Sequence, residues 1–170
     1  MSAKGTTKPE PSRTALSDAD IRSSLAFFGA PLQGCEPREV LDLDATLIAA
    51  LALSRMDPTV FRVLPLVLKR NLGQLDLERL RELACSRELL AEWGMLVDLA
   101  GEVLGVPALT AQAKKLSREV EQRERGQYFR SRSYFEGLLA ERRTPDVVRR
   151  WGYLMNMPLH VFRGLVEKHA

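Results

Sequence analysis

Apolar side chains recur every three or four residues along most of this chain, the spacing of one face of an α-helix. The clearest case lies between residues 89 and 104. The apolar positions there are Leu89, Leu90, Trp93, Leu96, Val97, Ala100, Val103 and Leu104. A second stretch, 47–53, is apolar on every side, as in a helix buried around most of its circumference. We find no convincing alternation of apolar and polar residues of the kind that predicts a strand.

Residues that typically begin and end helices divide the chain further. Asp57 and Pro58 form a cap followed by a proline in the first turn, and Thr144, Pro145 and Asp146 repeat that pattern. The predicted helices are 17–28, 39–55, 57–71, 76–84, 86–104, 108–122, 133–143, 144–154 and a final short one after residue 158. The sequence therefore predicts an all-α fold, a compact bundle of about seven to nine helices without significant sheet.

These elements indicate one domain with appended segments. Residues 1–16 are rich in Lys, Thr, Pro and Ser and predict a disordered tail. Residues 17–122 form the helical core, and 123–170 form a basic helical segment packed on it. The side chains expected at the centre of the core are Leu47, Leu51, Phe61, Leu64, Trp93, Leu96 and Val97.

The predicted helix 86–104 has two further features. Gly94 and Gly101 lie about two turns apart on one stripe, where another helix could approach closely. The side opposite the apolar stripe carries four acidic residues, which are Glu88, Glu92, Asp98 and Glu102. A recognition helix should not bring four carboxylates to DNA phosphates, so the acids argue against a helix-turn-helix at 75–105.

Charge is divided unevenly along the chain. Residues 1–105 hold 12 Lys and Arg against 15 Asp and Glu, whereas 106–170 hold 13 against 7. Arginines alternate with aromatic residues at 128–135 and again at 149–153. Such a basic face suits an acidic protein surface or a nucleic acid.

Trp, Tyr and Arg dominate the binding energy of many protein interfaces. The candidate partner-binding residues are therefore Arg130, Arg132, Arg142, Arg143, Arg149, Arg150, Trp151 and Tyr153. Trp151 is expected to be buried, with Tyr153 at an edge. The same residues also fit an ordinary apolar helix face with solvated arginines, and the aromatics at 128–135 also fit core anchors of that segment.

The sequence has no recognisable catalytic or metal-binding motif. Phosphate-binding loops, zinc-protease motifs and nucleophile elbows do not occur, and Cys35 and Cys85 form no CxxC pair. Asp42 and Asp44 are two residues apart, which on a helix directs their carboxylates to opposite sides. We predict a non-enzymatic protein without cofactor or metal, although an enzyme assembled from scattered residues remains an alternative.

The same composition predicts the cellular location. The chain has no apolar run of the ~18 residues that a membrane span needs. Its N-terminus lacks a secretory signal, and its two unpaired cysteines suit a reducing compartment. These features predict a cytoplasmic protein.

Two stretches resemble a known family. They are 43–71, with the sequence DPTVFRVLP, and 143–157, with the sequence RTPDVVRRWGYLMNM. They look like small helical antitoxin or partner proteins that are encoded beside nucleotidyltransferase-like toxins of the AbiEii type. The resemblance implies a bacterial protein that binds and neutralises or regulates such a toxin. A basic helix would complement the acidic, metal-binding cleft of that kind of enzyme. The alternative is a protein that binds RNA or DNA through its basic C-terminal half.

Overall fold

Nine α-helices make up most of the part of the chain that the computed structural model describes, residues 16–130 and 133–169. They are α1 Asp18–Phe27, α2 Leu43–Ser54, α3 Pro58–Asn71, α4 Leu77–Ser86, α5 Leu90–Leu104, α6 Pro107–Glu119, α7 Tyr134–Arg143, α8 Asp146–Arg149 and α9 Leu159–His169. A 3₁₀ turn, Leu72–Gln74, follows α3. Two short parallel strands, β1 Gly126–Gln127 and β2 Tyr153–Leu154, form the sheet of the described residues. The all-α prediction is confirmed.

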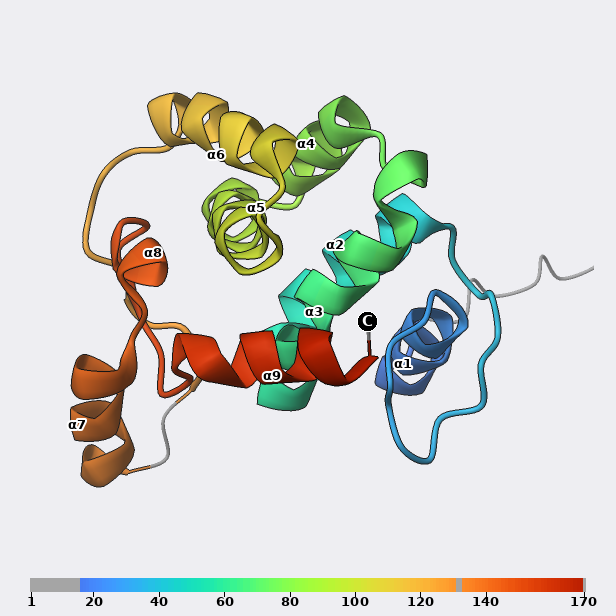
Figure 1. Cartoon of the computed structure of the whole chain (residues 1–170), viewed down its shortest axis with the longest axis horizontal. Helices are drawn as coiled ribbons and strands as arrows, with labels where there is room; N and C mark the ends of the chain where they lie inside the picture. Colours follow the sequence, from blue (N-terminus) through green and yellow to red (C-terminus); the bar gives the residue numbers. More distant parts are fainter. Residues whose placement is uncertain (1–15, 131–132, 170) are drawn as a thin grey trace, which may run out of the picture.

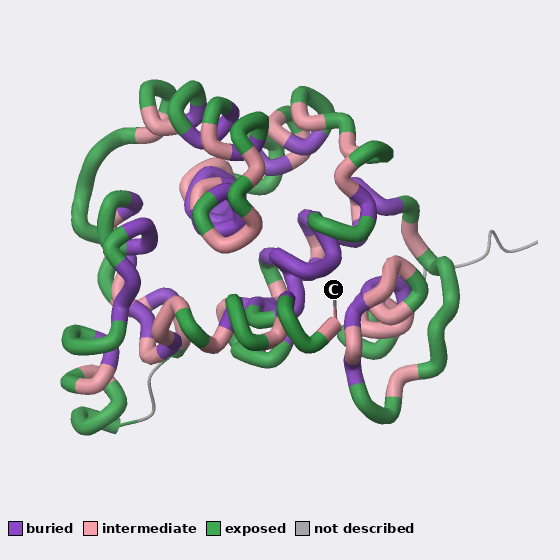
Figure 2. The backbone as a smooth tube through the Cα atoms, in the orientation of Figure 1, coloured by how far each residue is buried: buried purple, intermediate pink, exposed green. Residues whose placement is uncertain are grey.

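Helix α5 lies at the centre of the arrangement (Figure 1) and packs against α6, α3, α8, α9, α4 and α2. Figure 2 shows buried residues concentrated on α2, α3 and α5. The side chains predicted for the centre of the core are all fully buried there: Leu47, Leu51, Phe61, Leu64, Trp93, Leu96 and Val97. The tail predicted for residues 1–16 lies outside the described residues except for Leu16.

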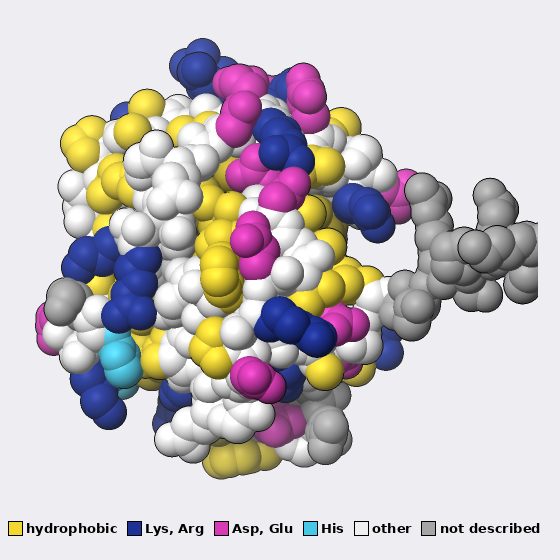
Figure 3. All heavy atoms as spheres, turned by 90° about the vertical axis from the view of Figure 1, so that its right-hand side faces the viewer, with side chains coloured by type: hydrophobic (Ala, Val, Ile, Leu, Met, Phe, Trp, Pro, Cys, Tyr) yellow, Lys and Arg dark blue, Asp and Glu magenta, His cyan; other side chains and the backbone are white. Residues whose placement is uncertain are grey.

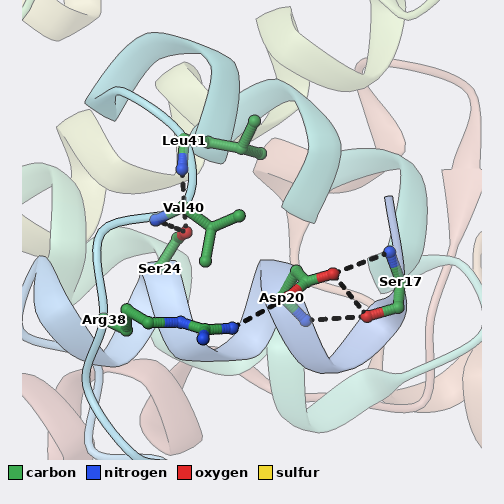
Figure 4. Close-up of polar contacts among 6 residues, drawn as sticks. All are labelled: Ser17, Asp20, Ser24, Arg38, Val40 and Leu41. Atoms are coloured by element: carbon green, nitrogen blue, oxygen red, sulfur yellow. Dashed lines mark hydrogen bonds and ion pairs between the residues drawn. The ribbon is translucent and has the colours of Figure 1, made fainter. Parts of the chain in front are cut away.

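Side-chain caps fix several of the predicted helix starts. At α1, Ser17 Oγ accepts a hydrogen bond from the backbone N–H of Asp20, whose carboxylate accepts one from the N–H of Ser17, at 3.2 Å each (Figure 4). Arg38 donates to the same carboxylate from the loop that follows α1. Ser24 accepts from the N–H groups of two further loop residues, so this loop is held against α1.

The predicted start of the long helix at Ser86 is wrong. Helix α4 continues through Ser86, whose hydroxyl donates back to the carbonyl of Leu83. Glu88 then adopts a left-handed conformation with φ of 59°, and the N–H of Leu89 bonds to the carbonyl of Ala84. A helix that ends in a left-handed residue usually has glycine at that position. Because Glu88 takes that position here, the sequence gives no sign that α4 ends there.

The predicted helix over 144–154 is also wrong. Helix α8 ends at Arg149, and Gly152 has a positive φ of 80°. The chain then pairs with β1, Tyr153 opposite Gly126. Thr144 does not cap α8, because its hydroxyl donates to the carbonyl of Ala140 and accepts from the N–H of Met155. Tertiary pairing has replaced about one and a half turns of helix that the local sequence favoured.

Asp42 and Asp44 do not point in opposite directions as a helix would require. Asp42 is the cap of α2, outside the helix, and accepts from the N–H of Ala45. The guanidinium of Arg79 on α4 contacts both carboxylates, Asp42 at 2.8 Å and Asp44 at 3.1 Å. Burial raises the pKa of the Asp44 carboxyl, whereas that hydrogen bond from Ala45 lowers the pKa of Asp42. The pair therefore joins α2 to α4.

Replacing Leu51 by Ala tests the central position of α2. We expect a loss of unfolding free energy on the order of 2–5 kcal/mol, since the side chain is fully buried and its removal leaves a cavity. Met56→Ala is the control, because Met56 is 60% exposed. Chemical denaturation measures both variants. Equal midpoints for the two would contradict the placement of Leu51.

Candidate partner-binding surface

The residues predicted to bind a partner lie in two different environments. Trp151 and Tyr153 are inside the protein, 2% and 3% exposed. The described arginines of the set are on the surface, and Arg132 lies outside the described residues. Tyr153 is thus not at an edge as expected. A partner would meet the arginines before it met either aromatic ring.

Trp151 packs directly against α5. Its ring lies so close to Gly94 that a Cβ atom on that glycine would be 2.2 Å from Cη2 of the indole. The indole N–H donates to Asp98 Oδ2 at 2.9 Å. The prediction of a close approach at Gly94 is correct, but a tryptophan side chain makes it. Gly101 faces Thr110 of the neighbouring helix α6.

Tyr153 is held by a buried carboxylate. Glu92, only 5% exposed, accepts a hydrogen bond from the Tyr153 hydroxyl at 2.7 Å and another from Arg55 at 2.9 Å. The spacing in the sequence predicts Glu92 on the side opposite the apolar stripe, whereas the structure buries it. A buried carboxylate is costly unless paired and hydrogen-bonded, and these two donors meet that need.

Tyr128 extends this buried group of residues. Its hydroxyl lies 2.7 Å from Ser54 Oγ, and Phe61 packs on its ring at a centroid distance of 4.8 Å. The guanidinium of Arg55 lies 5.6 Å from the centre of the Tyr128 ring and 5.8 Å from that of Tyr153. The first aromatic pair of the 128–135 stretch therefore anchors that segment in the core, which was one of the two alternatives.

Three of the predicted arginines already bond to other groups of the protein. Arg150 pairs with Asp98 at 3.2 Å, and Arg149 donates to the backbone carbonyl of Glu141. Arg143 donates to the side chain of Asn156 at 3.4 Å. Arg130 and Arg142 are exposed, and within the described part of the chain neither side chain has an ion pair or hydrogen bond. These two remain available to a partner.

Helix α7 exposes the large apolar residues of this region. Tyr134 is 83%, Phe135 67% and Leu138 40% exposed, whereas Ala140 is buried. At about 100° per residue, Ala140 lies on the opposite side of the helix from the other three. The helix thus packs inward through Ala140, with Leu139 half-buried beside it. In Figure 1 it lies at the end of the molecule away from α1.

We define the α7 face as Arg130, Tyr134, Phe135, Leu138 and Arg142. Phe135, Leu138 and Arg142 follow the i, i+3, i+7 spacing of one helix side. Arg130 reaches α7 at a small cavity of about 140 Å³ that it lines together with Glu136. The candidate residues predicted from the sequence include neither Tyr134 nor Phe135. A sequence signal existed, since Tyr134, Phe135 and Leu138 lie on the side of the predicted helix away from Ala140.

Comparison with known proteins adds no relative: no family model, curated protein or solved structure matches this chain. In the described residues no helix has the length and apolar character to cross a membrane. No group of three or more His, Cys, Asp and Glu side chains in that part of the chain could hold a metal ion.

Gly94→Ala tests the contact that holds Trp151. We expect a loss of about 1–3 kcal/mol of unfolding free energy, because the new methyl group overlaps the buried ring. Gly164→Ala in α9 is the matched control. That glycine has open space around it, so alanine should stabilise the helix by up to about 1 kcal/mol. Urea denaturation should show opposite signs, and a stabilised Gly94→Ala protein would contradict the packing.

The buried tyrosines predict a loss of stability in alkali. Burial raises the pKa of Tyr128 well above its ordinary 10.0, and burial followed by the hydrogen bond to Glu92 does the same for Tyr153. The folded state therefore favours the protonated phenols. Their contribution is complete below pH 10.0 and declines as the pH rises above that value.

We expect the Tyr128→Phe variant to lose stability less steeply above pH 10.0, by about 1.4 kcal/mol per pH unit relative to wild type. Tyr134→Phe, at an exposed position, should follow the wild-type curve. Denaturation midpoints as a function of pH measure both variants. Phenolate absorbance equivalent to all three tyrosines while the protein is still folded would refute the burial argument.

Proposed function

We propose that this protein is a non-enzymatic helical interaction module that binds an acidic partner protein through the α7 face. The observation that carries the proposal is the orientation of α7. Its large apolar residues Tyr134, Phe135 and Leu138 face solvent while Ala140 is buried. Contiguous exposed apolar side chains rimmed by polar groups are typical of interaction sites.

The shape of this surface favours a groove in the partner. A helix that projects apolar side chains at i, i+3 and i+4 spacing binds by inserting them into an apolar groove. Tyr134, Phe135 and Leu138 have this spacing, because Leu138 is four residues after Tyr134 and three after Phe135. Aromatic residues with few rotatable bonds are efficient anchors in such contacts.

The charge of this surface favours an acidic rim on the partner. Arg130 and Arg142 flank the apolar residues, and neither is neutralised by a described carboxylate. Complementary charge at the rim of an interface accelerates association and excludes partners of the same sign. The partner groove is therefore expected to be apolar at its base and acidic at its edge.

Trp151 and Tyr153 have a different role in this proposal. They fix the segment that follows α7 to α5, through Asp98 and Glu92. Arg149 contributes to the same support by its bond to the last turn of α7. These residues position the α7 face, and a partner contacts the face itself.

The family resemblance suggests one class of partner. Proteins that are encoded beside nucleotidyltransferase-like toxins would meet an acidic, metal-binding cleft, and the α7 face has the complementary charge. We therefore propose a toxin of that type as the first partner to test. This makes the protein an antitoxin-like regulator in the bacterial cytoplasm.

A nucleic acid is the second candidate. Exposed Tyr134 and Phe135 could stack on unpaired bases while Arg130 and Arg142 contact phosphates. The two candidates differ in their response to salt. Binding to nucleic acid weakens log-linearly with salt, because each phosphate contact releases a counterion.

The test uses two exposed phenylalanines on different helices. Phe135 lies on the α7 face, and Phe27 on α1 is 49% exposed. A photoreactive residue is placed at each position in the full chain, in cells of the source organism, and captured proteins are purified. Each is then titrated against the wild type, Phe135→Ala and Phe27→Ala. For the true partner, Phe135→Ala should weaken binding about thirtyfold, as expected for an anchor residue worth about 2 kcal/mol.

Three outcomes would contradict the proposal. The first is equal capture from both positions, and the second is equal affinity of both alanine variants. The third is loss of all captured protein after nuclease treatment, which would favour the nucleic-acid candidate. Sedimentation of the protein alone shows whether the captured chain is a second copy of this protein. A dimer that forms through Phe135 would mean that the α7 face binds a second copy and not a different protein.

A further inference from the structure

A hollow of about 560 Å³ lies at the other end of the molecule, where α1, α3 and α9 meet. Its basic lining comes from these three helices: Arg22, Arg62, Lys168 and His169. We call it the basic hollow. No Asp or Glu side chain of the described residues lines it. Figure 3 shows Lys and Arg side chains gathered beside a histidine on this side of the molecule.

Most of this charge is not balanced by nearby acids. Arg22 forms an ion pair with Asp57, so its charge is neutralised. Arg62 and Lys168 have no ion pair anywhere in the described structure. Arginines on other helices do find carboxylates, for example Arg79 with Asp42 and Arg81 with Glu119. Among the described residues, the hollow therefore holds at least two positive charges without a counter-charge.

The walls of the basic hollow are fixed by polar contacts of α3. Arg70 donates to the backbone carbonyl of His169 at 2.8 Å and to that of Gly29. Asn71 donates to the carbonyl of Phe28 at 2.9 Å. The ends of α9 and α1 are thus both attached to the last turn of α3. Lysine and arginine held on such a rigid frame lose less conformational entropy when they bind an anion than they would on a mobile loop.

The rest of the lining is apolar or weakly polar. Pro31, Leu32 and Leu165 form part of the surface, and Leu32 is only 9% exposed. Thr59 adds a hydroxyl in the first turn of α3, whose N-terminus is already capped by the Asp57 carboxylate. The apolar residues of this lining offer contact beside the two unpaired cations.

We propose that the basic hollow binds a small molecule that carries a phosphate group. Arg62 has a planar guanidinium that suits a phosphate in two parallel hydrogen bonds, and Lys168 adds a compact charge. Pro31, Leu32 and Leu165 provide apolar contact for the organic part of the ligand. The site is independent of the α7 face, because in Figure 1 α7 and α1 lie at opposite ends of the longest axis.

The experiment titrates the full chain with inorganic phosphate, adenosine 5′-monophosphate and adenosine, followed by calorimetry and by NMR. The test variant is Arg62→Ala with Lys168→Ala. The control variant is Lys69→Ala with Arg163→Ala, which removes the same charge from exposed residues of the same two helices without touching the lining. We expect each lost charge-assisted hydrogen bond to weaken phosphate binding by about tenfold or more, and the control to bind as wild type does.

Comparison of the three ligands separates the contribution of the phosphate group from that of the apolar walls. Binding of the monophosphate more tightly than inorganic phosphate supports a site with apolar walls, and equal binding supports a site for the phosphate group alone. Absence of saturable binding of either phosphate at millimolar concentration would overturn the proposal. So would an equal loss in the test and control variants, or binding of adenosine as tight as that of its monophosphate. Denaturation midpoints of both double variants establish that each is folded.

Discussion

The packing of Trp151 on Gly94 is the contact on which the C-terminal third of the protein depends. A glycine in the middle of a buried helix weakens that helix by roughly 1 kcal/mol relative to alanine, but here it makes room for a tryptophan ring. Asp98, one turn further along α5, accepts the indole N–H, and Glu92 accepts the hydroxyl of Tyr153. One helix thus provides the space and both acceptors. Tyr153 itself lies in β2, which pairs with β1.

This anchorage explains how α7 can stand away from the core. A helix of ten residues is too short to be stable by itself in water. The capping box at Ser133 and Glu136 and the contacts of Thr144 with Ala140 and Met155 hold its two ends. Its fully buried side chain is the methyl group of Ala140, and Leu139 is half-buried. Tyr134, Phe135 and Leu138 stay exposed, so they are accessible to a partner.

The local sequence predicts the features that local interactions decide. Asp57 with Pro58 begins a helix wherever it occurs in an apolar chain, and the all-apolar 47–53 is buried in any compact arrangement. Glu88 and Gly152 were different, because there the backbone conformation was set by a turn or by pairing with a distant strand. Glu92 was misplaced because periodicity locates its side of the helix but not the donors, Arg55 and Tyr153, that lie far away in the sequence. The α7 face was not predicted for the same reason. Whether an apolar side chain is exposed depends on whether a segment distant in the sequence packs on it.

Net charge along the chain locates a binding surface less well than the pairing of individual charges. The C-terminal segment is the more basic in sequence, yet Arg125 donates to backbone carbonyls and Arg150 pairs with Asp98. Those arginines stabilise the fold that carries the α7 face. Arg62, from the acidic half of the sequence, and Lys168, from the basic half, instead line one hollow, and neither has an ion pair among the described residues. A charge that is compensated inside the protein offers little to a ligand, whereas an uncompensated charge beside an apolar wall attracts an anion. An anion site is therefore better inferred from the charges that lack a counter-ion in the folded structure than from the net charge of a segment.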